Sequence, residues 1–267
     1  MSLTPREIPT GAVRFNTDSS KMEVYIGDTW MQVAVSSPNL DGGVRGLFGG
    51  GATPSNSDVI DFITISTTGD ATDFGNLLDS KGAHSGCGNE TRGLFGGGNP
   101  ETSSNKTDGI EFITIASTGN GVDFGNLNAA TASLCGTASP TRGLFMGGYT
   151  PTTLNTIQFV TVASTGNTQD FGDLTEVRQE AAAFANATRA ICAGGGPASA
   201  AQGSIDFFTI ATLGNASNFG DLITDMQSGM GATSSPTRGV VTTGTGVTNI
   251  IEYVEIRTSG DTVDFGE

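Results

Sequence analysis

Positive charge is scarce in this chain. Its 267 residues include 12 lysines and arginines against 27 aspartates and glutamates, a net charge of −15. The negative electrostatic field of such a chain repels the phosphates of nucleic acids and of anionic membrane surfaces. We therefore expect no nucleic-acid partner. No apolar run of about 18 residues is present to span a bilayer. The opening MSLTPREIPTG also lacks the basic and apolar regions of a signal peptide. We therefore expect synthesis in the cytoplasm and no membrane insertion.

Groups suited to catalysis and metal binding are also few. His84 is the one histidine and has no counterpart elsewhere in the chain, so we interpret it as a tolerated surface or channel residue. Cys87, Cys135 and Cys192 are odd in number and lack the spacing of metal ligands. They predict small buried hydrophobic side chains rather than a disulfide framework. Glycine triplets such as 49–51 are not followed by Lys-Ser/Thr, as a phosphate loop requires. The sequence predicts no cofactor and no metal.

Helical periodicity is missing too, and in its place the chain carries a fivefold repeat. The segment IDFITISTTGDATDF begins at Ile60, and similar segments of equal length begin at Ile110, Ile157, Ile205 and Ile251. An arginine-led segment, RGLFGGG in its first copy, precedes each of them. These arginines are Arg45, Arg92, Arg142, Arg189 and Arg238. They lie 47 to 50 residues apart, a period that indicates a repeat architecture.

Each repeat predicts four short strands: a run of small residues, the arginine-led strand, the isoleucine-led strand and a strand ending in Asp-Phe-Gly. Repeats of this length stack about an axis as propeller blades, with the small-residue strand nearest the axis. We predict an all-β fold with a five-bladed β-propeller over residues 38–267; a six-bladed propeller is the alternative. Length differences collect in the loop after the glycine-rich strand, which favours these loops as recognition sites.

Residues 1–37 lie outside the repeat. Three strand-like runs, 12–16, 21–27 and 29–35, are joined by connections short enough for hairpins. They predict a three-stranded meander, which contains the only tryptophan. We interpret this segment as a docking module whose attachment residues are Phe15, Tyr25 and Trp30. In the six-bladed alternative, residues 12–37 form or complete the sixth blade.

The residues that recur are interpreted as structural. We expect each repeat arginine to make one partly buried, charge-assisted contact. The aspartate of Asp-Phe-Gly is expected to accept backbone N–H groups in a turn or to pair with a repeat arginine, and the phenylalanine to pack in the core. The aspartates are Asp73, Asp123, Asp170 and Asp264, with Asn218 in the fourth copy. The phenylalanines are Phe74, Phe124, Phe171, Phe219 and Phe265.

These motifs carry a family resemblance. The glycine doublet or triplet ending one strand, the Ile-acid-aromatic strand and the arginine of each unit resemble kelch-type propeller repeats. Phenylalanine stands where kelch repeats carry tryptophan, and the glycine pair is lost at Thr242-Thr243. More closely, RGLFGGG with IDFITISTTGDATDFG is similar to repeats of virion-associated propeller proteins in marine tailed bacteriophages, a likeness that covers residues 40–267. Residues 9–33, PTGAVRFNTDSSKMEVYIGDTWMQV, are similar to segments that open many phage fibre and other virion structural proteins.

The resemblance implies a virion protein made in the host cytoplasm. The implied role is structural and non-enzymatic, as a capsid decoration, tail or fibre-associated protein. Its partners would be other virion proteins, with a homo-oligomer in the particle as an option. One alternative is an adsorption protein whose loops bind a host-surface glycan or receptor. A less favoured one is a glycoside hydrolase, because five-bladed glycosidases place carboxylates at the axis. The carboxylates off the repeat pattern are Asp79, Glu176, Glu180 and Asp225.

Overall fold

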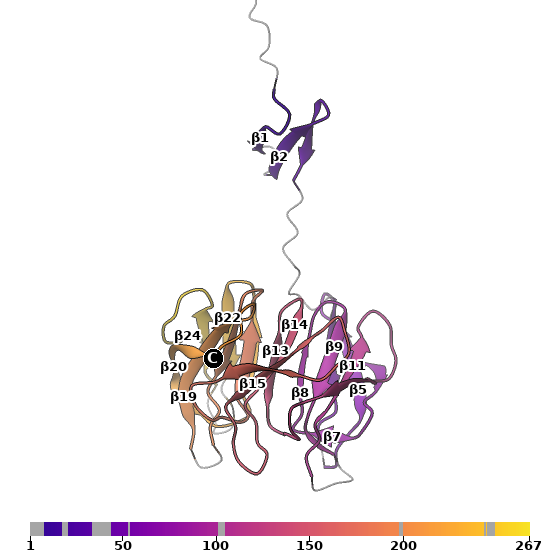
Figure 1. Ribbon diagram of the computed structural model, residues 1–267, viewed down its shortest axis with the longest axis vertical. Coiled ribbons are helices and arrows are strands. Elements are labelled where there is room, and N and C mark those ends of the chain that lie inside the picture. The colour runs from indigo at the N-terminus through magenta and orange to yellow at the C-terminus, as the bar shows by residue number, and fades with distance from the viewer. Residues whose placement is uncertain are drawn as a thin grey trace, which may run out of the picture. The chain divides into compact units, whose positions relative to one another are not determined.

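The computed structural model describes residues 8–17, 21–33, 44–52, 54–100, 105–197, 200–242, 244 and 249–267 (Figure 1). The chain divides into two compact units, Met1–Pro38 and Asn39–Glu267. Within the described ranges, 24 strands form small antiparallel sheets, and no element is a helix. The predicted all-β class is therefore confirmed. None of the described elements is a helix that could cross a membrane.

The first unit contains one three-stranded sheet. Its strands β1 (Val13–Asn16), β2 (Lys21–Ile26) and β3 (Thr29–Gln32) pair in sequence order. Gly27 and Asp28 connect β2 to β3 with φ values of 58° and 64°. Two successive residues with positive φ are what a tight hairpin turn requires, and glycine and aspartate adopt this conformation more readily than most residues.

In the described part of the second unit each sequence repeat forms one sheet of three or four strands, and we number these five sheets 1 to 5 in chain order. Sheet 1 consists of β4 (Arg45–Gly49), β5 (Val59–Thr64) and β6 (Thr72–Asn76). Sheet 2 consists of β8 (Ser85–Gly88), β9 (Arg92–Gly96), β11 (Gly109–Thr114) and β12 (Val122–Asn126). Sheet 3 consists of β13 (Cys135–Ala138), β14 (Arg142–Met146), β15 (Thr156–Thr161) and β16 (Gln169–Asp173).

Sheets 4 and 5 repeat this order. Sheet 4 consists of β17 (Ala182–Ala185), β18 (Arg189–Ala193), β19 (Gln202–Thr209) and β20 (Ser217–Met226). Sheet 5 consists of β21 (Gly231–Ser234), β22 (Arg238–Thr242), β23 (Ile251–Glu255) and β24 (Val263–Gly266). A further short pair joins β7 (Lys81–Gly82) to β10 (Asn99–Pro100). Sheets 2 to 5 thus have the predicted four strands. Sheet 1 has three described strands, and residues 34–43, upstream of it, lie outside the described part of the chain.

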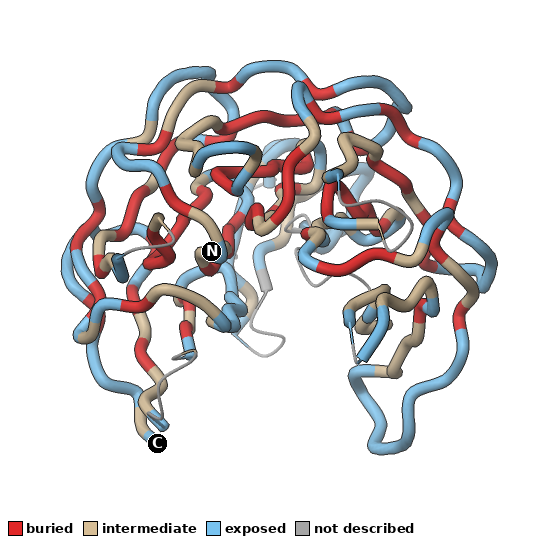
Figure 2. Tube along the Cα trace, turned by 90° about the horizontal axis from the view of Figure 1, so that it is seen from below, coloured by how far each residue is buried: buried red, intermediate tan, exposed pale blue. Residues whose placement is uncertain are grey.

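The five sheets follow one another round an arc, with sheet 1 at one end and sheet 5 at the other (Figure 2). The small-residue strands β8, β13, β17 and β21 contact one another in succession. A hollow of about 390 Å³ lies among them and is lined by residues such as Thr137, Ala183 and Ala232. The predicted small-residue strands therefore lie on the inner side of the arc, where neighbouring sheets come closest together.

The Asp-Phe-Gly motif forms a β-bulge in every sheet. In sheet 1, Ile60 pairs with Gly75 and the next residue, Asp61, pairs with Asp73, so Phe74 is the extra residue. The same shift recurs in the other four sheets. The motif glycine has a φ between 146° and 155° in all five copies. A Cβ atom on Gly75 would also lie 2.4 Å from the carbonyl oxygen of Gly119. The motif is thus explained by backbone geometry, because only glycine fits this position.

Candidate interaction surfaces

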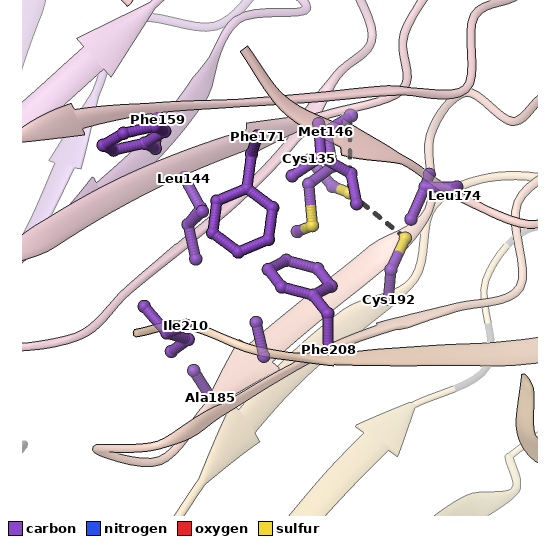
Figure 3. Close-up of a cluster of buried hydrophobic side chains, with 12 residues drawn as sticks. Cys135, Leu144, Met146, Phe159, Phe171, Leu174, Ala185, Cys192, Phe208 and Ile210 are labelled. Carbon is purple, nitrogen blue, oxygen red and sulfur yellow. Dashed lines mark hydrogen bonds between the residues drawn. The ribbon is translucent and has the colours of Figure 1, made fainter. Parts of the chain in front are cut away.

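The core of the second unit is divided into four clusters, each shared by two successive sheets. The cluster between sheets 3 and 4 includes Leu144, Phe171 and Phe208 (Figure 3). The other three clusters join sheets 1 and 2, sheets 2 and 3, and sheets 4 and 5. No such cluster joins sheets 5 and 1 among the described residues. Packing between neighbouring sheets therefore holds this unit together, and two sheet faces have no neighbouring sheet among the residues that the structure describes.

The repeat arginines make the first polar contact of each interface. Arg92 donates from Nη1 to the carbonyl oxygen of Val162 in the next sheet over 2.9 Å, and its guanidinium lies 4.5 Å from the ring centre of Phe112. Arg45, Arg142 and Arg189 donate in the same way to Ile115, Ile210 and Ile256, and each stacks on an aromatic ring of its own sheet. The charge-assisted contact expected for these residues is thus made to a backbone carbonyl and not to a carboxylate.

The glycine turn before each Asp-Phe-Gly makes the second contact. Gly119 of sheet 2 donates its N–H to the carbonyl oxygen of Phe74 over 2.8 Å, and the Oδ1 atom of Asn120 accepts the N–H of Asn76. Gly166, Gly214 and Gly260 make the equivalent bond to Phe124, Phe171 and Phe219. The covered phenylalanines are each 2% exposed. The predicted core role of these four residues therefore has a specific form: the following sheet closes over each ring.

Sheet 5 presents an equivalent face, against which no sheet of the described part of the chain lies. Arg238 stacks on Tyr253 but pairs with Glu255 of its own sheet at 2.8 Å, and both charged side chains are more than two-fifths exposed. Phe265 is 55% exposed, in contrast to the 2% of its four counterparts. We call Arg238, Tyr253, Val263 and Phe265 the sheet-5 face. This face keeps the arginine donor and the apolar side chains found at the other interfaces. It lacks the backbone carbonyl acceptor and the covering side chains that a following sheet provides elsewhere.

Sheet 1 presents the complementary half of the interface. Ile65 holds the position whose counterparts accept the arginine bond, and it is 60% exposed, whereas Ile115, Val162, Ile210 and Ile256 are at most 6% exposed. Phe48 is 60% exposed, while Phe95 and Phe145 at the same repeat position are buried. We call Val44, Phe48 and Ile65 the sheet-1 face. The sheet-5 face carries the arginine and the exposed aromatic rings, and the sheet-1 face carries the carbonyl position and exposed apolar side chains. Neighbouring sheets bring the same two sets of groups together.

The motif aspartates lie outside this interface. Asp73, Asp123, Asp170 and Asp264 are exposed, as is Asn218. Asp264 accepts the N–H of Gly266 over 3.1 Å. In the part of the chain that the structure describes, no ion pair joins a motif aspartate to a repeat arginine. The bulge explains this arrangement, because it turns the phenylalanine into the core and leaves the preceding aspartate on the solvent side.

One face of the N-terminal sheet is apolar except for Thr29, which pairs with Ile26. Paired residues share a face and successive residues alternate between faces, so the register places Val13, Phe15, Met22, Val24, Ile26, Met31 and Val33 together. All of them except Val24 are between 38% and 60% exposed. The opposite face carries Arg14, whose guanidinium lies 4.1 Å from the ring of Trp30, and Tyr25 packs edge-on against the same tryptophan. Phe15 thus belongs to the apolar face, whereas Tyr25 and Trp30 belong to the other.

Sequence reasoning missed most of this apolar face, although the signal was available. The strict alternation Val13-Arg14-Phe15-Asn16 is typical of a strand with one apolar side. The sequence-based prediction included only aromatic residues, of which Phe15 alone lies on this face, and it omitted the aliphatic and methionine residues. By contrast, no local sequence pattern predicts that Phe48 and Ile65 are exposed. They fit the repeat pattern, and the residues at the same positions in other repeats are buried. Their exposure follows from their place in the arc.

His84 lies at a cavity on the inner side of the arc. The cavity has a volume of about 250 Å³ and is lined by residues of several repeats, including Ser133, Glu180 and Met230. Burial, with help from the charge of Lys81, lowers the pKa of His84 to about 4. Of the four carboxylates off the repeat pattern, Glu180 lines this cavity, whereas Asp79, Glu176 and Asp225 do not. A glycosidase site needs two carboxylates flanking one bond, so the cavity gives no support to that alternative.

Residues of two variable loops, together with Ala130, line a hollow. It has a volume of about 420 Å³, and its lining includes Lys106, Ala130, Tyr149 and Pro151. The ammonium group of Lys106 lies 4.5 Å from the ring centre of Tyr149.

Among the described residues, no group of three or more histidine, cysteine, aspartate or glutamate side chains is placed to share a metal ion. Comparison with protein-family models gives no match for the chain, and none of the curated proteins compared with it matches significantly.

Proposed function

We propose that this protein is a non-enzymatic structural component of a phage virion, attached by its N-terminal sheet and presenting a kelch-like β-propeller on the particle. In this proposal the five sheets are the blades of the propeller. The repeat contacts between neighbouring sheets support the blade assignment, since one arginine bond, one glycine-turn bond and one shared core recur at four interfaces. The sequence resemblance supports the virion assignment.

The observation that carries the attachment role is the apolar face of the N-terminal sheet. Phe15 and Val13 are 60% and 58% exposed, and Met31 is 54% exposed. A contiguous apolar surface exposed to water marks a binding surface. We infer that another virion protein of the capsid, tail or fibre covers this face. Additional copies of the chain are the competing occupant.

Substitutions on the two faces of the sheet test this assignment. The double variant Phe15→Ser with Met31→Ser removes apolar surface from the apolar face, and Gln32→Ser changes the opposite face. Tagged full-length chains would be expressed during infection, and purified particles would be assayed for the tag. We expect the double variant to be lost from particles and Gln32→Ser to be retained, with equal thermal unfolding of the second unit in both. Full incorporation of the double variant into particles would overturn the attachment role. Loss of self-association without loss of incorporation would identify copies of the chain as the occupant.

A second candidate function is adsorption to a host-surface glycan, favoured by the hollow that contains Tyr149. Sugar rings pack on aromatic side chains, and the surrounding polar loops could donate and accept hydrogen bonds. Tyr149 is 37% exposed. Tyr149→Ala should abolish binding to host cells if this hollow holds the glycan, whereas Tyr253→Ala, on the sheet-5 face, should not. Equal binding by both variants and the unmodified chain would remove this candidate.

A further inference from the structure

Two of the three cysteines come together between sheets 3 and 4. Cys135 begins the inner strand β13 of sheet 3, and Cys192 lies on β18 of sheet 4. Their Sγ atoms are 3.5 Å apart although the residues are 57 positions apart in the chain. Both side chains are buried within the cluster that joins the two sheets (Figure 3). Among the described residues, the sulfur of Cys87 makes no contact with another cysteine sulfur. All three cysteines are free thiols in this structure.

We propose that Cys135 and Cys192 are a site of reversible oxidation, at which a disulfide forms between sheets 3 and 4 and cross-links one interface of the arc. The inference does not depend on the virion assignment. The three cysteines are interpreted from the sequence as small buried hydrophobic side chains rather than a disulfide framework, and the proposal departs from this interpretation for Cys135 and Cys192 only. The two sulfur atoms are already in contact across the interface, so little movement is needed to form the bond.

The surroundings favour reaction at Cys192. Its pKa is lowered, first because the Cys135 thiol donates a hydrogen bond to the Cys192 thiolate, and also because of the nearby charge of Arg178. The pKa of Cys135 is raised by the same hydrogen bond and by burial. One thiol of the pair is therefore the first to become a thiolate, which is the nucleophile in thiol oxidation, and the other remains protonated beside it.

The oxidant we assign is a peroxide, which is small enough for a buried site. The Cys192 thiolate attacks one peroxide oxygen, the O–O bond breaks, and a sulfenic acid and hydroxide result. The sulfur of Cys135 then attacks the sulfur of Cys192, forming the S–S bond and expelling the second hydroxide. The two thiol protons convert both hydroxides to water. In total, two thiols lose two electrons and two protons, and one hydrogen peroxide is reduced to two molecules of water.

Repeat counterparts show which substitutions the fold accommodates. The position of Cys135 is held by Ser85, Ala182 and Gly231 in the other repeats, and that of Cys192 by Phe95, Phe145 and Val241. Cys135→Ala and Cys192→Val therefore place at each site a residue that the same position already holds elsewhere. Cys87→Ala serves as the control. If either test variant fails to fold, the other still reports on the pair.

The test uses the full-length chain, reduced, freed of reductant and treated with hydrogen peroxide. After alkylation in denaturant, trypsin separates the three cysteines into the peptides 82–92, 107–142 and 190–238. Mass spectrometry without reductant should find the last two joined, in the unmodified chain and in Cys87→Ala, and not in the other two variants. Oxidation should also raise the melting temperature by about 5 °C or more, because the new loop restricts the unfolded chain. A reductant should reverse this rise. Absence of the cross-link, or equal amounts of cross-links that involve Cys87, would overturn the proposal.

Discussion

Lys81 and Glu111 form a buried ion pair, with 2.5 Å between Nζ and Oε1 and with side chains 5% and 2% exposed. The pair lies within one repeat: Lys81 precedes the inner strand of sheet 2, and Glu111 is on β11. Arg178 and Asp206 form the same pair in the fourth repeat at 3.3 Å, with both side chains fully buried. In the third repeat these positions hold Thr131 and Gln158, which are also buried. The third repeat thus loses the cation and the acid together, whereas the fifth keeps a buried Glu252 opposite Gln227, and its carboxylate accepts hydrogen bonds from Thr262 and from the N–H of Ile223.

This exchange leads to the first prediction. Lys81→Thr should lower the free energy of unfolding by about 3 kcal/mol, because it leaves the carboxylate of Glu111 buried without its counter-charge. Adding Glu111→Gln should restore part of the loss, because the double variant reproduces the neutral pair of the third repeat. Chemical denaturation of the two single variants and the double variant gives the coupling energy. Strictly additive losses would show that the two side chains do not compensate each other.

The paired exchange could have been found from the sequence, and other features of the interface could not. The acid lies in the isoleucine-led segment, which aligns without gaps, and the cation lies eleven residues before the repeat arginine, so the joint exchange in the third repeat can be read from the sequence. The partner of Arg142 is the backbone oxygen of Ile210, 68 residues away, and a backbone acceptor leaves no mark on residue type. The openness of the arc is also absent from the sequence pattern.

The repeat arginines differ in what lies beside them, and this difference gives the second prediction. Arg142→Ala removes a hydrogen bond to the next sheet and a cation–π contact with Phe159. The loss should be about 2 kcal/mol, or a fall in melting temperature of roughly 4–8 °C. Arg238→Ala is the matched control at the same repeat position. It should leave the melting temperature almost unchanged, because surface ion pairs contribute little. Equal shifts for both variants would contradict the role assigned to the interface bond.

The third prediction concerns acid stability and the single histidine. The pKa of His84 in the folded protein is about 4, below its ordinary value, because burial disfavours the charged form. Between about pH 6.5 and 4 the unfolded chain therefore binds a proton that the folded chain does not, so stability falls as the pH falls through this range. From pH 7.5 to 5, this group should contribute a loss of about 2 kcal/mol.

His84→Leu should remove this part of the pH dependence. Leucine occupies the same repeat position at 134, so the cavity wall already accommodates it in the third repeat. Urea unfolding of both chains at pH 7.5 and pH 5 measures the difference. The carboxylates contribute equally to the two proteins, so they cancel in the comparison. Parallel losses in the two proteins would show that His84 is as accessible to protons in the folded state as in the unfolded one.

The fourth prediction compares two phenylalanines at the same repeat position, Phe219 and Phe265. Phe219→Ala should lower the free energy of unfolding by about 3–5 kcal/mol, because sheet 5 buries this ring and the substitution leaves a cavity. Phe265→Ala should cost less than about 1 kcal/mol, because the sheet-5 face leaves the ring more than half exposed. Thermal or chemical denaturation of the two variants, at a low protein concentration, makes the comparison. A large loss for Phe265→Ala would mean that the sheet-5 face is covered in solution. Its dependence on protein concentration would then distinguish cover by sheet 1 of the same chain from cover by a second molecule.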